Sequence, residues 1–299
     1  MKSAGKLFRA AVEANKPLQC LGAVNAYSAL LAKQAGAKSL YLSGSGVATA
    51  SHGLPDLGIT NLNDVCDDIR RITSIMSDVP LLVDVDTGFG SALGIRRCVQ
   101  SLIKSGAGAM QIEDQVAEKR CGHRPGKQVV PVDEMIDRLR TADMARHEYD
   151  KDFVIMARTD CYATEGMDGL LARCEQYISK GKADMLFPEA LTKLEEYKTL
   201  ADHMKKQKLH APILANITEF GKTPLFNAHD LHKHGVSIVL YPLSAHRAMA
   251  KAAQIVYKSI IENGSQAKVI NLMQTRDELY EALDYYKYER ILDELFEQK

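Results

Sequence analysis

The sequence predicts an α/β protein built as a closed (β/α)8 barrel of the TIM type, with an extra helix at its C-terminal end. Short apolar runs recur eight times along the 299 residues, and segments with helical periodicity separate them. Eight such pairs in roughly 250 residues match a barrel better than an open doubly wound sheet. No linker divides the chain, so we expect one barrel domain over 1–299, with 275–299 as a helical extension.

Each of the eight apolar runs is unbroken rather than alternating, as expected of a parallel strand that is covered on both faces. Gly, Pro or Asp bounds each run. The predicted strands, in chain order, are 20–24, 39–43, 81–86, 109–114, 153–158, 183–188, 211–216 and 236–241. The rival fold is a nucleotide-binding sheet, but after the second strand Gly44 and Gly46 begin a G-x-G motif whose third glycine is replaced by Thr49.

The segments between the strands carry helical signals. In 64–77, one apolar stripe faces the sheet, formed by Val65, Ile69, Ile72 and Met76. Two Thr-x-x-Glu pairs fit a capping box that satisfies free amide groups at a helix start. These pairs are Thr192 with Glu195 and Thr275 with Glu278. The second pair opens 275–299, an amphipathic, tyrosine-rich helix that we expect to dock on the barrel or on a neighbouring subunit.

The composition excludes two classes of partner. Lys and Arg total 38, as do Asp and Glu, so the formal net charge is +0 and the sequence pI is near 7.1. This balance removes the broad electrostatic attraction to nucleic acids and anionic membranes. No run approaches the roughly 18 apolar residues of a membrane-spanning helix. We therefore expect neither nucleic acid nor membrane as a partner.

The cysteines and the N-terminal segment bear on location. The six cysteines include no Cys-x-x-Cys pair, and a disulfide framework is unusual in so long a chain. We expect free thiols in a reducing compartment. The first 19 residues lack the charged head and apolar block of a secretion signal, and Glu13 is unusual in a mitochondrial presequence. These features favour the cytoplasm.

Polar and charged residues end the otherwise apolar strands, where barrel enzymes keep their active sites. Buried without partners, such groups are costly, so a shared site with a metal and an ionic ligand accounts for them. The alternative is that some of them only cap the following helices. The residues are Ser43, Asp84, Asp86, Glu113, Asp114, Arg158, Asp160, Glu189, Asn216 and Thr218.

Four carboxylates among or near these strand ends predict a metal site. Strand alternation sends the side chains of Asp84 and Asp86 to the same face, with Glu113 on the adjacent strand and Asp56 in the preceding loop. Hard oxygen ligands without histidine favour Mg²⁺, with Mn²⁺ as the alternative, over zinc. Because Mg²⁺ usually keeps several waters, we expect some of these acids to act through water.

A basic, glycine-containing loop over 119–127 follows the fourth strand and contains a single thiol, Cys121. Nearby cations lower the pKa of a thiol and suit a proton donor or a nucleophile. A cysteine in a basic loop is often incidental, but this one directly follows the strand end at Glu113. We therefore interpret Cys121 as a catalytic residue.

With these residues assembled, the chain resembles the isocitrate lyase and phosphoenolpyruvate mutase superfamily over nearly its whole length, and within it the methylisocitrate branch. The K-R-C-G-H loop at 119–123 is typical of the lyases in that superfamily. Later segments, 241–247 and 273–280, are typical of the methylisocitrate branch. The other matching segments are 41–44, 53–56, 84–90, 112–115, 156–160, 186–190 and 214–219.

The resemblance implies Mg²⁺-dependent cleavage of the tricarboxylate 2-methylisocitrate into pyruvate and succinate, a step of propionate breakdown. It also implies a homotetramer in which the eighth helix is swapped between subunits. Asp84 and Asp86 correspond to metal sites, with Asp56 and Glu113 as outer-sphere partners. The positions that correspond to substrate contacts are Ser43, Gly44, Ser45, Cys121, Gly122, Arg158, Glu189, Asn216, Ile217, Thr218, Arg247 and Arg276.

The chemistry of that reaction assigns roles to several of these residues. Three arginines, Arg158, Arg247 and Arg276, would hold the substrate carboxylates. Cys121 would protonate the departing succinate carbon, and Tyr41, on the same strand face as Ser43, is the predicted base for the hydroxyl proton.

Two other functions remain open from the sequence. One is a different reaction of the same superfamily, such as that of isocitrate lyase or of an oxaloacetate hydrolase or decarboxylase. The other is a barrel without catalytic activity that binds a metal and a tricarboxylate as a sensor or scaffold. The presence of Cys121, Asp84 and Asp86 together favours an enzyme.

Overall fold

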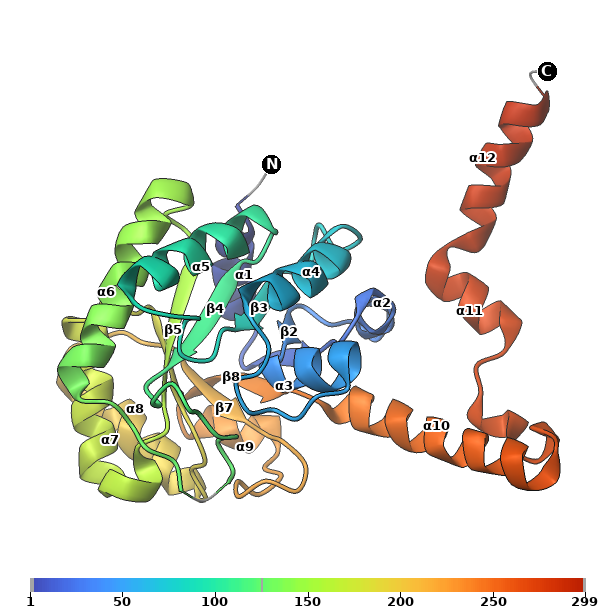
Figure 1. Ribbon diagram of the computed structural model, residues 1–299. Helices are drawn as coiled ribbons and strands as arrows, with labels where there is room; N and C mark the ends of the chain where they lie inside the picture. Colours follow the sequence, from blue (N-terminus) through green and yellow to red (C-terminus); the bar gives the residue numbers. More distant parts are fainter. Residues whose placement is uncertain (1–2, 125, 298–299) are drawn as a thin grey trace.

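Eight parallel strands form a closed barrel in the computed structural model, which describes residues 3–124 and 126–297 (Figure 1). The strands follow one another around the barrel in chain order, and β1 pairs with β8 to close it. This confirms the predicted fold class. The strands are β1 Leu18–Gly22, β2 Leu40–Leu42, β3 Leu81–Asp84, β4 Ala109–Glu113, β5 Val154–Thr159, β6 Met185–Pro188, β7 Ile213–Asn216 and β8 Val236–Tyr241.

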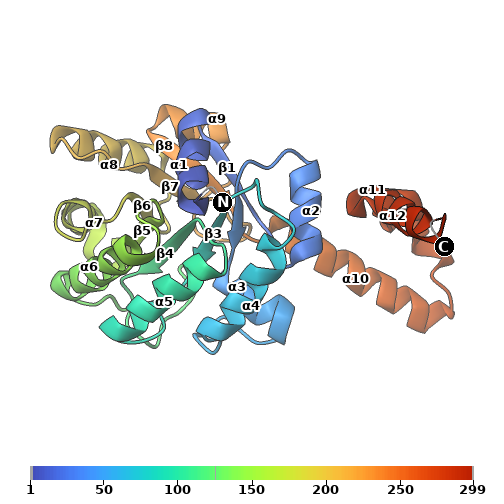
Figure 2. The same ribbon diagram turned by 90° about the horizontal axis from the view of Figure 1, so that it is seen from above.

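Helices surround the barrel, as the view from above shows (Figure 2). The helices before β5 are α1 Ala4–Ala14, α2 Ala26–Gln34, α3 Gly44–Gly46, the π-helix η1 Val47–Ser51, α4 Leu62–Thr73, α5 Ala92–Lys104 and α6 Val132–Tyr149. Those after β5 are α7 Tyr162–Ser179, α8 Leu194–Lys206, α9 Ala228–Lys233, α10 Ser244–Asn263, the 3-10 helix η2 Ala267–Leu272, α11 Arg276–Leu283 and α12 Tyr285–Glu297. Among the described residues, no helix is long and apolar enough to cross a membrane.

The predicted helix starts are right in one case and wrong in the other. Thr275 and Glu278 form the capping box at α11: Glu278 accepts from the Thr275 N–H at 2.6 Å, and Thr275 Oγ1 accepts from the Glu278 N–H at 3.2 Å. At α8, Thr192 and Glu195 do not pair. The helix begins at Leu194, which places Glu196 rather than Glu195 where its carboxylate accepts from the preceding backbone N–H groups.

Two apolar layers stabilise the barrel. One fills the barrel interior with inward-facing strand residues such as Leu82, Met156 and Phe187. Helix α1 adds the fully buried Phe8 to this layer. The other lies between the strands and the surrounding helices, where Val65, Ile69, Ile72 and Met76 are all buried as predicted. Both layers are typical of a barrel whose interior is packed and whose outer face is covered.

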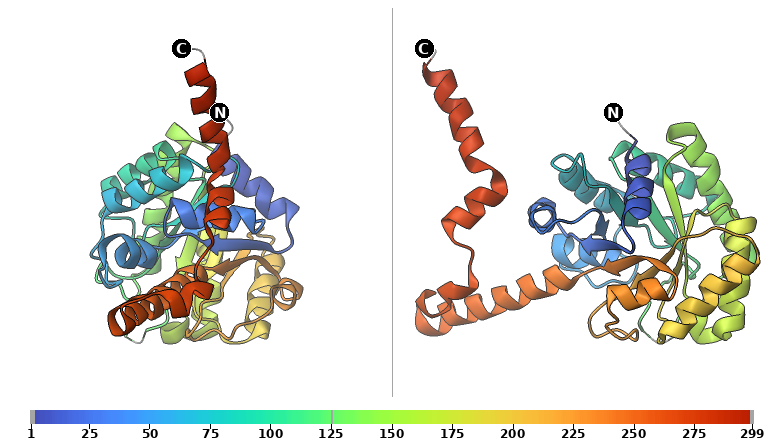
Figure 3. Two further views of the ribbon diagram at one scale, coloured as in Figure 1. Left: turned by 90° about the vertical axis from the view of Figure 1, so that its right-hand side faces the viewer. Right: turned by 180° about the vertical axis from the view of Figure 1, so that it is seen from behind.

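The C-terminal segment differs from the single helix that the sequence predicts for 275–299. Within the described residues it forms two helices, α11 and α12, because Asp284 takes a left-handed conformation with φ of 51° between them. Residues 298–299 lie outside the described part. The preceding helix α10 leads away from the barrel, and α12 projects beyond it (Figure 3). The segment between η2 and α11 contacts its own barrel at α2, where Tyr27 Oη donates to Gln274 Oε1 at 2.8 Å.

A buried polar network joins β4, β5 and α7 immediately beneath the functional strand ends. Asp114, at the end of β4, accepts hydrogen bonds from Thr159 Oγ1 at 2.6 Å, Tyr177 Oη at 2.8 Å and the Asp160 N–H at 2.9 Å. Arg173 of α7 donates to Tyr177 Oη at 3.0 Å. The network fixes the relative positions of Glu113 and Arg158, because each is the neighbour of one of its members.

Replacement of Tyr177 by Phe should weaken this network without changing the packing of the ring. Loss of the hydroxyl takes one donor from the Asp114 carboxylate and one acceptor from Arg173, so the free energy of unfolding should fall by about 1–2 kcal/mol. Urea unfolding of the variant measures it. The matched control is Tyr149→Phe at the end of α6, a half-exposed tyrosine outside this network, which should change stability by less than about 0.5 kcal/mol. Equal stability of both variants would show that the Tyr177 hydroxyl contributes nothing.

Candidate active site

A polar cavity of about 290 Å³ opens at the carboxyl ends of the strands. Its walls come from the ends of β2, β3 and β5 to β8 and from the loop after β4. The predicted site residues that line it are Tyr41, Ser43, Ser45, Asp56, Asp84, Cys121, Gly122, Arg158, Glu189, Asn216, Thr218 and Arg247. The structure therefore brings together residues that lie up to about 200 positions apart in the chain.

Strand alternation explains how these side chains reach the cavity. Five of them lie two positions after a residue whose side chain fills the barrel interior, and side chains two apart on a strand share a face. Leu82 precedes Asp84 in this way, and Met156 precedes Arg158. The further pairs are Tyr41 with Ser43, Phe187 with Glu189 and Leu214 with Asn216. These five side chains thus form the layer of the barrel interior that lies nearest to the carboxyl ends of the strands.

The two aspartates after β3 do not lie on one strand, contrary to the sequence prediction. The strand ends at Asp84, and Asp86 has a left-handed backbone with φ of 47°, so strand alternation does not apply to it. The two groups remain together because the Asp86 N–H donates to Asp84 Oδ1 at 3.1 Å. Asp84 also accepts from the Gly44 N–H at 3.0 Å and from the Gln111 amide.

Arg158 is the centre of a buried ionic cluster. Its Nε lies 2.9 Å from Asp160 Oδ2 and 3.2 Å from Glu113 Oε2, and its Nη2 lies 3.3 Å from Glu189 Oε2. The guanidinium group also stacks 5.1 Å above the ring of Phe187. Three carboxylates thus hold the guanidinium group in a fixed orientation at the bottom of the cavity.

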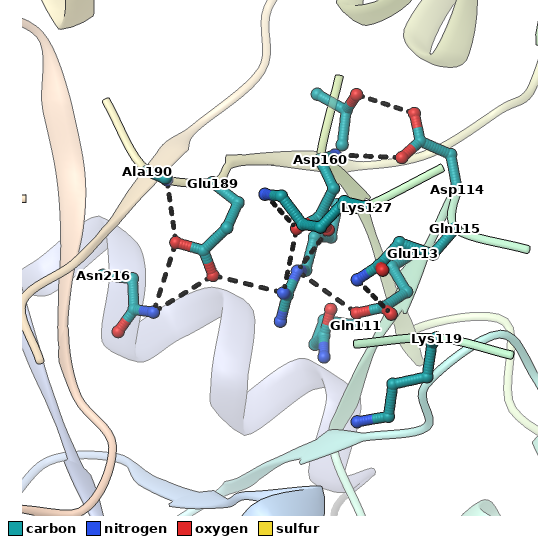
Figure 4. Close-up of polar contacts among 12 residues, drawn as sticks. Gln111, Glu113, Asp114, Gln115, Lys119, Lys127, Asp160, Glu189, Ala190 and Asn216 are labelled. Carbon is teal, nitrogen blue, oxygen red and sulfur yellow. Dashed lines mark hydrogen bonds and ion pairs between the residues drawn. The ribbon is translucent and has the colours of Figure 1, made fainter. Parts of the chain in front are cut away.

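Glu189 and Asp160 anchor this cluster on two sides (Figure 4). Glu189 accepts hydrogen bonds from the Ala190 N–H at 2.8 Å and from Asn216 Nδ2 at 3.2 Å. Asp160 accepts from Lys127 Nζ at 2.8 Å. Burial alone would raise the pKa of Asp160, but the charges of Arg158 and Lys127 outweigh it and lower that pKa. Asp160 is therefore an ionised partner of both cations.

The loop after β4 places Cys121 at the cavity through its neighbour Gly122. A side chain at residue 122 would lie 2.4 Å from Arg158 Nη2 and 2.6 Å from Glu189 Cγ, so only glycine allows the loop to lie directly on the ionic cluster. The next residue, His123, accepts the Lys222 N–H at Nδ1 (3.0 Å), and its Nε2 lies 3.3 Å from Glu189 Oε1. Burial lowers the pKa of His123, which favours the neutral ring.

The prediction that surrounding cations lower the pKa of Cys121 is wrong for this conformation. Burial raises the pKa of the thiol above its ordinary value, and this effect exceeds the opposing contributions of the His123 N–H and of Arg158. Two cations of the loop pair with other groups: Lys119 with Asp56 and Lys127 with Asp160. Cys121 is therefore a protonated thiol at neutral pH.

Tyr41 lies at the cavity as predicted, but its environment disfavours the role of a base. The side chain is 2% exposed, and burial together with the charge of Asp84 raises its pKa well above the ordinary value. A phenol in this state stays protonated. Tyr41 can therefore donate a hydrogen bond to a ligand oxygen. Because it is already protonated, it cannot accept the proton of the substrate hydroxyl.

Several other predicted residues do not line the cavity. Gly44, Asp86 and Glu113 lie behind its wall, where they contact Asp84 or Arg158. Ile217 points into the apolar core, because alternation places it opposite to Asn216; it does not contact the cavity. Arg276 is exposed on α11, which α10 carries away from the barrel, so the structure does not bring it to the site of its own chain.

The cavity has one further arginine, Arg247, at the start of α10. Its Nε lies 3.7 Å from Glu219 Oε2, and its guanidinium group lies 5.7 Å from the ring centre of Phe220. The side chain is 45% exposed, in contrast to 9% for Arg158. Arg247 is thus an exposed cation at the rim, and Arg158 a buried one at the bottom.

The acids near β3 suit a hard divalent cation. In the described part of the chain, no group of three or more His, Cys, Asp and Glu residues is arranged to hold a metal by itself. Mg²⁺ needs only one or two carboxylates and keeps waters in its other positions. The carboxylates of Asp56 and Asp86 already hold a cation, the ammonium group of Lys119. The ammonium group occupies the position of a cation, so these two carboxylates suit a positively charged partner.

Sequence reasoning assigned no ion-pair or hydrogen-bond role to three residues of the site, Gln111, Lys119 and Lys127. The position of Gln111, two before Glu113 on β4, was a usable signal because alternation directs both side chains inward. The pairing of the two lysines had no such signal, since each crosses from a loop to another strand end.

Comparison with known proteins gives the family. The model of the phosphoenolpyruvate phosphomutase family matches residues 8–261. The 2-methylisocitrate lyase of Escherichia coli (strain K12) is 54% identical over 297 residues, which is 99% of this chain and 97% of that protein. The enzyme of the same name from Bacillus subtilis (strain 168) is 41% identical and covers 95% of this chain and 90% of its own.

Solved structures agree with this result. A 2,3-dimethylmalate lyase, described as a member of the PEP mutase/isocitrate lyase superfamily, is 30% identical with a TM-score of 0.88, over 97% of this chain and 95% of that one. A phosphonopyruvate hydrolase in complex with oxalate and Mg²⁺ is 25% identical with a TM-score of 0.82, over 97% and 98% of the two chains. The chain described here belongs to the phosphoenolpyruvate phosphomutase family, within the isocitrate lyase superfamily.

Proposed function

We propose that the chain is a carbon–carbon lyase that cleaves 2-methylisocitrate into pyruvate and succinate, in the breakdown of propionate. The observation that carries this proposal is the joint presence, in one cavity, of a protonated thiol at Cys121, a fixed cation at Arg158 and the carboxylate of Asp84, with Asp86 directly behind it. Relatives that are 53–54% identical to this chain, among them the Escherichia coli protein, are named for this reaction.

Binding of a tricarboxylate would use the cations of the cavity. Arg158 and Arg247 both line the cavity, where each would pair with a separate carboxylate of the substrate. The amide of Asn216 adds a polar contact: its Oδ1 is buried and has no hydrogen-bond partner among the described residues. An unsatisfied buried atom at a cavity wall is typical of a ligand site.

Asp84 and Asp86 are the residues that we propose to hold Mg²⁺, with Asp56 and Glu113 acting through water; Mn²⁺ would fit the same oxygens. When bound, the ion supplies stabilisation of negative charge on the hydroxyl and carboxylate oxygens of the substrate. A Mg²⁺ ion in the phosphonopyruvate hydrolase neighbour supports this assignment.

In the cleavage step, the substrate hydroxyl gives its proton to one of the carboxylates that line the cavity and becomes the carbonyl of pyruvate. The bond to the neighbouring carbon breaks, and its electron pair stays on the succinate carbon. That carbon takes a proton from the Cys121 thiol, which the raised pKa keeps protonated until the negative charge develops. Tyr41 would donate a hydrogen bond to the substrate oxygen rather than accept its proton.

Other reactions of the superfamily remain as alternatives. The neighbours include an oxaloacetate acetylhydrolase, 27% identical with a TM-score of 0.89 over 98% of this chain and 97% of that one. Its substrate is a dicarboxylate, and the cavity described here has arginines at both its bottom and its rim. The second cation favours a substrate with a further carboxylate.

A product assay tests the proposed reaction. Purified protein with Mg²⁺ should convert 2-methylisocitrate into equimolar pyruvate and succinate, and EDTA should abolish the activity. The rate constant kcat/KM for 2-methylisocitrate should exceed that for isocitrate by at least about tenfold, because a buried methyl group contributes on the order of 1–3 kcal/mol. Equal rates with both substrates would contradict the proposed specificity.

Asp84→Ala and Asp86→Ala should each lose the Mg²⁺-dependent rate.

Replacement of Cys121 by Ser tests the proton donor. A serine hydroxyl is far less acidic than a thiol, so kcat should fall by roughly 10²–10⁴-fold while KM changes little. The matched control is Cys161→Ser: that thiol is also in a loop after a strand but is fully buried outside the cavity. A Cys121→Ser enzyme with unchanged kcat would exclude the thiol as proton donor.

We also propose that the chain forms a homotetramer in which α10, the helix after β8, packs on a neighbouring barrel. In support, α10 extends away from its own barrel and exposes Tyr257 and Ile261, at 69% and 85% (Figure 3). Apolar exposure of this extent is typical of an interface. The same exchange would place Arg276 near a partner's cavity.

The free thiols of the chain favour the cytoplasm as its location.

Measurement of mass by light scattering tests the exchange. Wild-type protein should give the mass of a tetramer, and Ile261→Glu should give smaller species because it puts a charge into the proposed interface. The control is Met144→Glu on α6, which is 70% exposed and lies on the opposite side of the barrel (Figure 1). An Ile261→Glu tetramer as stable as wild type would contradict the swapped helix.

A further inference from the structure

We propose that Gln111, a fully buried glutamine of β4, is a positioning residue for the metal site: its amide orients the Asp84 carboxylate so that the carboxylate's free lone pair faces the ion. The inference rests on the metal site proposed above and deepens it. It assigns to Gln111 a role in the geometry of a metal ligand rather than a contact with substrate.

The position of Gln111 in the barrel is the first observation. Its Cα is paired with that of Asp84 in the register of the neighbouring strands β3 and β4. Both side chains point inward, since each follows by two positions a residue of the interior layer, Ala109 or Leu82. Gln111 is 0% exposed, and Figure 4 shows it beside Glu113 of the same strand. The amide is therefore enclosed directly against Asp84.

The hydrogen bonds of the Asp84 carboxylate are the second observation. Its Oδ2 accepts from the Gly44 N–H at 3.0 Å, and its Oδ1 accepts from the Asp86 N–H at 3.1 Å and from Gln111 Nε2. A carboxylate accepts at about four positions, so these three donors leave one position on a group that lines the cavity. One free position suits a single bond to Mg²⁺, which takes one or two carboxylates and otherwise keeps waters.

The other end of the amide indicates that this residue is not explained by folding alone. The nitrogen of Gln111 must face Asp84, because two acceptor oxygens would repel each other. This leaves Oε1, which is buried and accepts no hydrogen bond among the described residues. An unpaired buried carbonyl costs stability, whereas methionine has a similar length and leaves no polar atom unpaired. The amide is therefore accounted for by what its nitrogen does at Asp84.

Loss of the amide has a defined consequence for the metal site. Without it, Asp84 Oδ1 keeps only the backbone N–H of Asp86, and the carboxylate can rotate about its bond to Cβ. Its free lone pair is then no longer held toward the cavity. Hydrogen-bond partners that orient a metal ligand typically contribute 10–100-fold to metal affinity. Removal of the Gln111 amide should therefore weaken metal binding.

The test is Mn²⁺ binding, measured by electron paramagnetic resonance on the full chain without substrate. Gln111→Met should raise the dissociation constant of Mn²⁺ by roughly 10–100-fold. Gln111→His should recover most of the affinity, because its ring N–H can replace the amide donor. Circular dichroism shows whether each variant is folded. If the methionine variant is not, Gln111→Asn replaces it, since its amide is one methylene too short to reach Asp84.

Asn216 provides the matched control. It is also a buried amide, 8% exposed, with an unpaired carbonyl oxygen. Its nitrogen donates to Glu189 rather than to Asp84. Asn216→Leu therefore removes a buried amide of the same kind and should leave the dissociation constant of Mn²⁺ within about twofold of wild type, because it contacts no proposed metal ligand.

Three results would overturn the role of Gln111. They are unchanged or tighter Mn²⁺ binding in folded Gln111→Met, no recovery in folded Gln111→His, and an equal loss in Asn216→Leu. Failure of the metal site itself is recognised separately, because Asp84→Asn would then bind Mn²⁺ as wild type does. That result would reject the metal site and this inference together.

The Mg²⁺ dependence of the product assay gives a second measurement. In Gln111→Met, the Mg²⁺ concentration for half-maximal rate should rise by the same factor as the dissociation constant of Mn²⁺. At saturating Mg²⁺, kcat should return to within about threefold of wild type, because the amide does not touch the reacting atoms. A loss of kcat that saturating Mg²⁺ does not restore would assign Gln111 to the chemical step and overturn the positioning role.

Discussion

The site depends on the neutralisation of carboxylates that are buried together at the mouth of the barrel. Asp86, Asp160 and Glu189 are each at most 8% exposed, and isolated charges in such positions would be strongly destabilising. Each has a buried cation within about 3.3 Å, namely Lys119, Lys127 or Arg158. Because two of these cations belong to the loop after β4, the charge balance of the barrel and the position of the loop cannot be separated.

This constraint explains the close fit of the loop. Gly122 lies against Arg158 and Glu189 with no room for a side chain, and His123 reaches Glu189 through Nε2. The buried network around Asp114 holds the underlying strand ends in place, since it links β4, β5 and α7. The loop therefore rests on a rigid surface, and the position of Cys121 depends on that surface.

The sequence predicts the barrel and most of the cavity lining because both follow from short-range patterns. Unbroken apolar runs identify the strands, and a period of two directs Arg158 and Glu189 inward. Where the pattern ends, the predictions fail. Asp86 leaves the strand through a left-handed residue, and Ile217 faces away from the cavity although its neighbours face it.

The remaining differences have a common physical origin in contacts between distant parts of the chain. The sequence shows many cations around Cys121 but does not show that Lys119 and Lys127 are already paired with carboxylates from other strands. Likewise, helical periodicity over 275–299 does not reveal the break at Asp284 or the direction that α10 takes from the barrel. The resemblance implied a substrate contact for Arg276, which α10 carries away from the cavity of its own chain.

The paired loop cations also decide what kind of group Cys121 is. A thiol beside free cations would be a thiolate at neutral pH and hence a nucleophile. Here Lys119 and Lys127 are paired with carboxylates, burial dominates, and the thiol keeps its proton. A proton donor must still hold its proton when negative charge appears on the substrate carbon. The ion pairs that balance the buried carboxylates therefore also favour acid catalysis over nucleophilic attack at this position.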